Sequence, residues 1–275
     1  MSSISAGSIA GPCASALNSL TPSQINFLQN LPKAELHAHL NGSIPINVLQ
    51  DLAREHAATP GNNDSEIVRT GLEQLARGIE LKEIGDFFGL FPAIYTLTST
   101  PSVLARATRS VLQLFLDGPM PQCTYLELRS TPRATPYMTR REYVEAVLQE
   151  IERFNLDANV NTGAGAVVKA ALIVCLDRRM DAEVAKECVD IAVSMRQSGR
   201  GVVGVDLCGD PMVRRVFHIS VHFRNVERDV DDNLDIKQAG DMQEFADYFR
   251  EAKEAGLGVT VHIAEVIPSS PPYTL

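Results

Sequence analysis

The chain has 275 residues, of which 45% are hydrophobic, and a formal net charge of −9 at pH 7. This is enough apolar material for one large core, and α/β barrels of this length are commonly single domains. The acidic balance argues against nucleic acid as a partner, because a nucleic-acid binder needs a basic surface. No apolar run reaches the length of a membrane span, and the first twenty residues lack the basic start and apolar stretch of a secretory signal. We therefore expect a cytoplasmic protein that binds neither nucleic acid nor membrane.

The five cysteines, at positions 13, 123, 175, 188 and 208, show no C-x-x-C spacing. Their number is odd, and three of them lie in or beside apolar runs that resemble strands. This pattern favours buried free thiols in a reducing compartment over a disulfide framework.

Residues 1–23 are mostly small and polar, and we expect a mobile tail there, with a short helix over 23–32 leading into the first strand. Apolar runs then alternate with helical patterns. The expected strands cover 34–40, 124–130, 168–177, 202–206 and 259–264. The expected helices cover 45–56, 102–116, 140–154, 181–197 and 242–255. Such alternation predicts parallel strands joined by crossover helices, and the nearly continuous apolar runs predict strands covered on both faces.

Polar residues gather at the carboxyl ends of these strands, which is the end that carries the chemistry in a (β/α)8 barrel. The stretch 57–101 is longer than a simple connection and is expected to form a helical excursion over the mouth. Five strands are visible where a closed barrel has eight, and residues 266–275 form a turn-rich tail. The predicted fold is thus α/β, a (β/α)8 TIM-barrel type, incomplete at about five of eight βα units.

The most informative residues are His37 and His39, at the end of the first apolar run. Residues i and i+2 of a strand point to the same side, so both imidazoles can face one metal ion. His262 ends a distant strand and can join them, with Glu265 placed to exchange protons near a metal-activated water. His56 lies at a polar helix end and is interpreted as an ordinary hydrogen-bonded surface residue.

Five motifs in order resemble the adenosine deaminase family, and in particular its adenosine deaminase-like branch that acts on N6-methyl-AMP. They are LPKAELHAHLNGSI at 31–44, YLELRSTPR at 125–133, LDRR at 176–179, VGVDLCGDP at 203–211 and AGLGVTVHIAE at 255–265. Matches to five ordered motifs across 24–265 make chance similarity improbable. Cytidine-type zinc deaminases are excluded, because the H-x-E and P-C-x-x-C elements are absent.

The resemblance implies one zinc ion per chain, held by His37, His39 and His262, with Glu265 as the proton donor. It implies a substrate site made of eight residues: His39, Asn41, Ser130, Thr131, Pro132, Arg133, Asp177 and Gly209. Tyr95 stands where the branch often has a histidine. The implied reaction is hydrolytic deamination of a 6-aminopurine nucleotide or nucleoside, N6-methyl-AMP to IMP or adenosine to inosine. Arg133 is a plausible 5′-phosphate partner, because a guanidinium binds phosphate bidentately. A monomer is the form expected from the family.

Two departures from the family pattern accompany the resemblance. Residues 213–238 interrupt the motif that otherwise reads GDPMAGDMQEF, and we hypothesise that this insert is a translated intron. His218 and His222 inside it are given no role. The family also takes a water-orienting histidine from its sixth strand and an Asp-Asp pair from its eighth, whereas no His, Asp or Glu follows Glu265. The alternative expectation is therefore a truncated product that is catalytically inactive and retains a partial zinc site.

Overall fold

The computed structural model describes residues 15–16, 18–59, 64–77, 84–117, 121–161, 169–209 and 242–263. Residues 1–14 of the tail predicted at 1–23, the insert at 213–238 and the segment 266–275 lie outside these ranges, as do Glu265, His218 and His222. What was predicted for these residues therefore stays a prediction.

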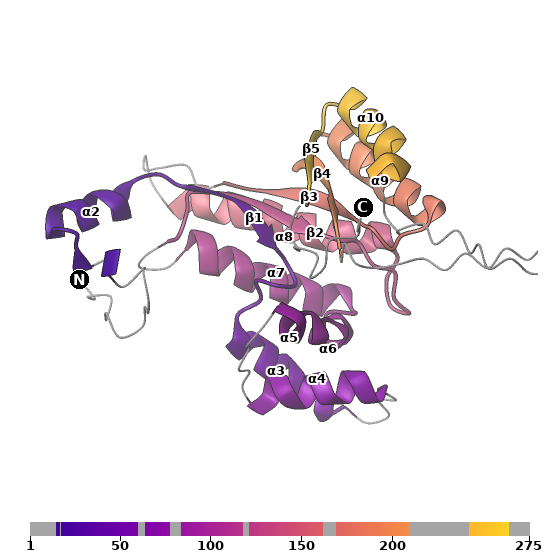
Figure 1. The fold of residues 1–275 in the computed structure, drawn as a ribbon, viewed down its shortest axis with the longest axis horizontal. Helices are drawn as coiled ribbons and strands as arrows, with labels where there is room; N and C mark the ends of the chain where they lie inside the picture. Colours follow the sequence, from indigo (N-terminus) through magenta and orange to yellow (C-terminus); the bar gives the residue numbers. More distant parts are fainter. Residues whose placement is uncertain are drawn as a thin grey trace, which may run out of the picture.

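Five parallel strands form one sheet in chain order, β1-β2-β3-β4-β5. Their bounds are β1 Ala34–His39, β2 Tyr125–Ser130, β3 Lys169–Asp177, β4 Val202–Cys208 and β5 Gly258–Val261. Each lies on one of the predicted apolar runs. The sheet curls rather than lying flat (Figure 1), and it corresponds to a (β/α)8 barrel with five of its eight strands.

The helices occupy the intervals between the strands. Their bounds are α2 Pro22–Asn30, α3 Ile46–Ala57, α4 Glu66–Arg77, α5 Ile84–Gly89, α6 Phe91–Leu97, α7 Pro101–Leu116, α8 Arg140–Asn161, α9 Ala182–Gln197 and α10 Ala246–Glu254, the last preceded by the 3-10 turn Met242–Phe245. Helices α7 to α10 pack against one another and against the sheet in chain order. Helices α3 to α6 form a separate group at one end of the sheet (Figure 1). Of these, α4 to α6 lie within 57–101, which confirms the helical character predicted for that stretch. None of the helices in the described ranges has the length and apolarity to cross a membrane.

Burial divides the strands into two kinds. Eight of the nine residues of β3 are buried, and so is most of β4. In contrast, β1 is largely exposed and β5 has no buried residue. The expectation that every strand is covered on both faces was therefore wrong for these two, because each pairs with one neighbour only among the described strands.

The core lies between the sheet and helices α7 to α9, and Leu128 of β2 is fully buried in it. We expect Leu128→Ala to lower the free energy of unfolding by about 2–5 kcal/mol, because the substitution leaves a cavity among packed side chains. Leu156→Ala on α8 is the matched control, since Leu156 is 69% exposed and its truncation should change stability by less than about 0.5 kcal/mol. Urea unfolding measures both. Equal losses in the two variants would contradict this assignment of the core.

Candidate metal centre and adjoining cavity

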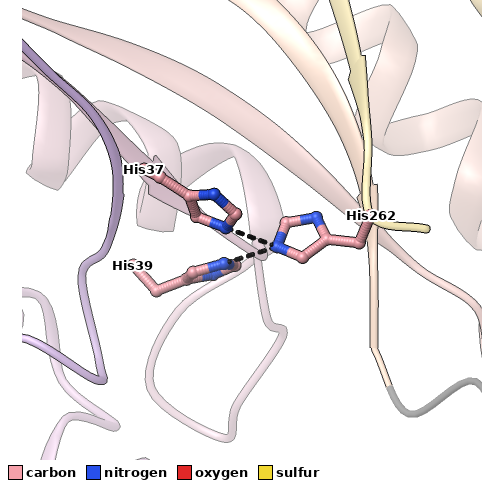
Figure 2. Close-up of side chains that lie close together, drawn as sticks. All are labelled: His37, His39 and His262. Carbon is pink, nitrogen blue, oxygen red and sulfur yellow. Dashed lines mark hydrogen bonds between the residues drawn. The ribbon is translucent and has the colours of Figure 1, made fainter. Parts of the chain in front are cut away.

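Three histidine side chains converge at the carboxyl edge of the sheet (Figure 2). The Nε2 atom of His262 lies 2.8 Å from Nε2 of His37 and 2.9 Å from Nε2 of His39. The rings of His37 and His39 have centroids 5.5 Å apart, so the two imidazoles face the same side, as their spacing predicts. The structure thus brings together the three residues predicted as metal ligands, although His37 is exposed rather than buried.

Backbone contacts fix where these side chains lie. At the end of β1 the N–H of Leu40 donates to the carbonyl of Arg129 on β2. At the end of β5 the N–H of His262 donates to the carbonyl of Leu207 on β4, and Arg178 donates to the carbonyl of His262 at 2.6 Å. The histidines therefore project from two strands whose ends are tied to their neighbours.

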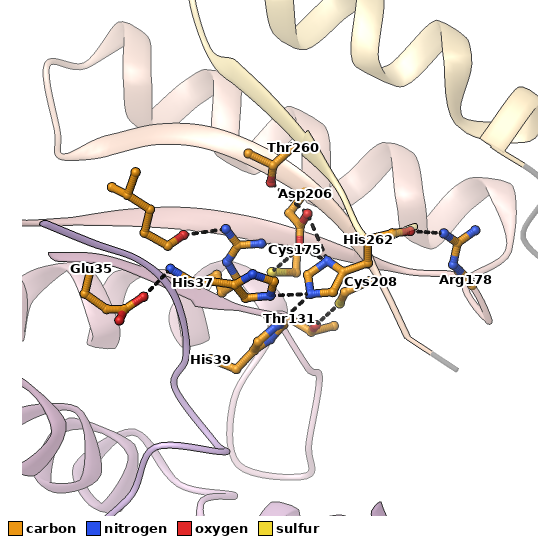
Figure 3. A network of polar contacts seen from close by, with 12 residues as sticks. Glu35, His37, His39, Thr131, Cys175, Arg178, Asp206, Cys208, Thr260 and His262 are labelled. Atoms are coloured by element: carbon orange, nitrogen blue, oxygen red, sulfur yellow. Dashed lines mark hydrogen bonds and ion pairs between the residues drawn. The ribbon is translucent and has the colours of Figure 1, made fainter. Parts of the chain in front are cut away.

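Asp206 of β4 contacts Nδ1 of His262, the ring nitrogen that does not contact the other two histidines (Figure 3). Its carboxylate is fully buried and lies 3.0 Å from Nδ1 of His262, 3.2 Å from a guanidinium nitrogen of Arg129 and 2.7 Å from the hydroxyl of Thr260. Burial by itself raises the pKa of Asp206, but the hydrogen bonds from His262 and Thr260 outweigh it and lower that pKa to about 2. Asp206 is therefore an anion, and it holds the Nδ1–H tautomer of His262 in place.

The three imidazoles fit a zinc ion by their chemistry. With Nδ1–H of His262 donating to Asp206, its Nε2 carries the lone pair that a metal needs. Burial, followed by repulsion from His262 whenever that ring is protonated and from the Arg129 guanidinium, lowers the pKa of His39 to about 4, so His39 is neutral near pH 7. Nitrogens bound to a tetrahedral zinc ion lie about 3.3 Å apart, which requires only a small spreading of this cluster.

A cavity of about 1110 Å³ lies between α3, α6 and the segment that follows β2, and none of the three histidines is among its lining residues. Four of the predicted substrate residues line it: Thr131, Pro132, Arg133 and Asp177. The hydroxyl of Thr131 lies 3.6 Å from Sγ of Cys208, which connects the cavity wall to the side chains beneath the histidines. His56, which was predicted to be an ordinary hydrogen-bonded residue rather than a ligand, lines the cavity, where its Nε2 lies 2.8 Å from the carboxylate of Asp64.

Arg133 stands out among the charged groups of this cavity. Its guanidinium lies 3.8 Å from the ring centroid of Tyr95 and donates to the hydroxyl of Thr98 at 3.1 Å. Its Nε–H is buried without an acceptor, and no carboxylate of the described residues pairs with it. The carboxylates in the lining are already engaged: Glu55 by Arg106, Asp64 by His56, Asp177 by Arg179, and Asp181 by the first turn of α9. The Nε–H of Arg140 in the lining is also buried without an acceptor, but Arg140 is paired with Glu187. Among the lining arginines, Arg133 is therefore the one whose charge no carboxylate of the described residues balances, and it is the natural contact for an anionic ligand.

The remaining predicted substrate residues are not among those that line the cavity. Ser130 is buried and bonded to the hydroxyl of Tyr143 at 2.8 Å. Asn41 donates to that same hydroxyl at 3.4 Å, while its own amide oxygen is buried without a partner. Gly209 has φ +102°, and a Cβ there would lie 2.8 Å from the carboxylate of Asp177. Only glycine allows this close approach. The proton donor predicted by the resemblance, Glu265, lies outside the described residues.

Sequence reasoning missed two groups that support this centre, the Arg129–Asp206 ion pair and Tyr143. Both charged residues stood at strand ends where polar groups were noted, but their pairing depends on the strand register. Tyr143 lies in a helical pattern like any core aromatic residue, and no sequence signal distinguishes its hydroxyl.

Comparison with known proteins agrees with this geometry. Residues 32–240 match the family model described as adenosine deaminase. The human N6-methyl-AMP deaminase is 31% identical over 251 residues, which cover 89% of this chain and 58% of that protein. The Arabidopsis thaliana N6-mAMP deaminase is 31% identical over 258 residues, covering 88% of this chain and 62% of that protein.

Solved structures show the same relationship. A crystal structure of the Arabidopsis N6-mAMP deaminase has a TM-score of 0.62 and 29% identity, covering 88% of this chain and 61% of that one. A second Arabidopsis structure, described as ADAL complexed with IMP, has a TM-score of 0.61 with the same identity and coverage. The curled parallel sheet with helices packed against it matches an incomplete (β/α)8 fold of the amidohydrolase type. This chain belongs to the adenosine deaminase family, and it spans about three fifths of the length of these relatives.

Proposed function

We propose that this protein deaminates a 6-aminopurine 5′-nucleotide by zinc-dependent hydrolysis, with N6-methyl-AMP as the substrate and IMP and methylamine as products. The observation that carries the proposal is the convergence of His37, His39 and His262 at the carboxyl edge of the sheet. A cavity that holds Arg133, an arginine without a carboxylate partner among the described residues, adds to it. The names of the relatives support the substrate class, and the Arabidopsis complex with IMP supports a nucleotide ligand.

In this proposal the three histidines hold one zinc ion, which when bound supplies the Lewis-acid chemistry that activates a water molecule near neutral pH. Asp206 keeps His262 in the tautomer that leaves Nε2 free. Glu265 donates a proton to N1 of the purine as water adds to C6 and the exocyclic amine leaves. Asn41, Ser130, Thr131, Pro132, Asp177 and Gly209 surround the nucleotide, with His39 beside the reacting carbon.

Arg133 is assigned to the 5′-phosphate, because a guanidinium with an unpaired N–H in a partly closed cavity suits a dianion. Tyr95 supports this arginine rather than contacting the base, since it stacks against the guanidinium and burial raises its pKa to about 12. A 5′-phosphate bound to Arg133 would then fix how far the purine of the nucleotide extends towards the histidines.

The test is turnover of N6-methyl-AMP, AMP and adenosine by the purified, zinc-loaded chain, followed by purine absorbance. We expect Arg133→Gln to raise KM for the nucleotide by about 10- to 100-fold, the loss of one or two charge-assisted hydrogen bonds, and to leave the nucleoside unaffected. Arg250→Gln is the control, because Arg250 pairs with Asp247 on the exposed face of α10 and neither residue lines the cavity. Equal effects on nucleotide and nucleoside would contradict the phosphate assignment. If the chain binds zinc but turns over none of the three substrates, the deaminase proposal is wrong and the alternative holds: an inactive protein with a partial zinc site.

A further inference from the structure

Two cysteines lie on the same face of the sheet as the histidine cluster. Cys175 of β3 is in register with Asp206 of β4, and Cys208 stands two residues beyond Asp206. Side chains alternate along a strand, so Cys175, Asp206 and Cys208 point to the same face. Figure 3 shows both sulfurs gathered with His39 around His262. Both cysteines are buried, Cys175 completely and Cys208 with 7% of its surface exposed.

The surroundings of this pair differ from those of the other described cysteines. Cys123 and Cys188 belong to the hydrophobic core, whereas Cys175 and Cys208 do not. The thiol of Cys175 lies 3.6 Å from the carboxylate of Asp206, and that of Cys208 lies 3.6 Å from the hydroxyl of Thr131. Buried thiols usually pack as small apolar groups, and these two contact polar groups instead.

A disulfide does not suit the pair. The register separates them by one strand spacing and two residues along the strand, which corresponds to a Cα–Cα distance of about 8 Å. That exceeds the limit of about 7 Å for a bridge formed without movement of the backbone. Both cysteines are free in the structure.

A metal ion suits them better. The two sulfurs and one ring nitrogen of His39 all lie within 4.8 Å of one another. Ligand atoms around a tetrahedral ion with Zn–S bonds of about 2.3 Å and Zn–N bonds of about 2.0 Å are separated by roughly 3.3–3.8 Å. The three atoms therefore need to close by little more than about 1 Å, which side-chain torsions can supply.

We propose that His39, Cys175 and Cys208 form a second cation site that selects a thiophilic metal ion. Two sulfur ligands favour soft ions such as Cu(I) or Cd²⁺ over Mg²⁺ or Ca²⁺. Binding replaces two S–H bonds by two metal–sulfur bonds and releases both protons to solvent. His39 belongs to this site and to the histidine cluster alike, so a soft ion bound here competes with the zinc ion of the proposed function for that ligand. This competition, unlike the site itself, depends on the proposed function.

The experiment titrates the metal-free chain with Cd²⁺ alone and follows the thiolate-to-cadmium charge-transfer absorbance. Two variants are compared. The double variant carries Cys175→Ser and Cys208→Ser. The triple variant carries the substitutions at the other three cysteines, Cys13→Ser, Cys123→Ser and Cys188→Ser. We expect the triple variant to keep the absorbance band at one Cd²⁺ per chain and the double variant to lose it. A Cys→Ala version of the double variant, checked by circular dichroism, ensures that a loss is measured on folded protein.

The proposal is overturned if the folded triple variant shows no cadmium charge-transfer band, or if the double variant keeps that band. Its outcome is separable from that of the proposed function. His37→Gln should abolish zinc retention and leave the cadmium band, whereas His39→Gln should weaken both. A cadmium band insensitive to His39→Gln would overturn the assignment of the third ligand.

Discussion

Replacing His262 by alanine is expected to abolish zinc retention. His262 is the member of the cluster that contacts both other histidines, at 2.8 and 2.9 Å, and it is 8% exposed. Its loss leaves His37 and His39, which lie on one strand, without the third ligand that both of them contact. Removal of an outer-shell partner typically weakens metal binding 10- to 100-fold, so loss of a direct ligand should exceed about 100-fold.

The measurement is metal content after dialysis against a chelator, followed by calorimetric titration with zinc. His56→Ala is the control, because His56 is paired with Asp64 in the cavity wall and does not contact the cluster. A second control is His218→Ala with His222→Ala, two histidines of the insert to which we assign no metal. Retention of one zinc ion per chain by His262→Ala would refute the proposed centre.

The order and approximate bounds of all five strands could be predicted from the sequence, because each is an apolar run with polar residues near its carboxyl end. Helix ends were less predictable. Helix α8 continues to Asn161, beyond the predicted end at 154, since no glycine or proline interrupts the chain before Gly163. At its C-terminal part the side chain of Asn155 bonds both backbone groups of Ala170 at the start of β3. That contact links residues whose pairing depends on the fold.

The candidate site was predictable to a similar extent. The i, i+2 spacing of His37 and His39 gave their common direction, and the motif order supplied His262 as their partner. The spacing did not predict how exposed each histidine side chain is. His37 lies on an edge strand and is exposed, whereas His262, directly after β5, is buried. The sequence also did not predict that His39 lies close both to the other two histidines and to two cysteine thiols. It requires β1, β3 and β4 to be placed in one curled sheet before the three residues become neighbours.

The buried ion pair behind His262 gives the second large expected effect. Asp206 is fully buried, and Arg129 has 5% of its side chain exposed. Asp206→Asn preserves the shape of the side chain but leaves the Arg129 guanidinium without its countercharge. Breaking one partner of a buried pair typically costs about 3–5 kcal/mol, because the remaining charge is uncompensated. The same substitution also removes the anion that fixes the tautomer of His262, which should weaken zinc binding by about 10- to 100-fold.

Two comparison variants separate the stability effect from the metal effect. Asp177→Asn removes the carboxylate at the end of the neighbouring strand, but its partner Arg179 is 56% exposed, so stability should fall by no more than about 1 kcal/mol. The double variant Arg129→Met with Asp206→Asn should recover most of the lost stability, since neither charge is then buried alone. Zinc affinity should stay low in the double variant, because the carboxylate is still missing. If zinc affinity recovered together with stability, Asp206 would act on the metal centre only through the integrity of the sheet. The orienting role assigned to it would then be wrong.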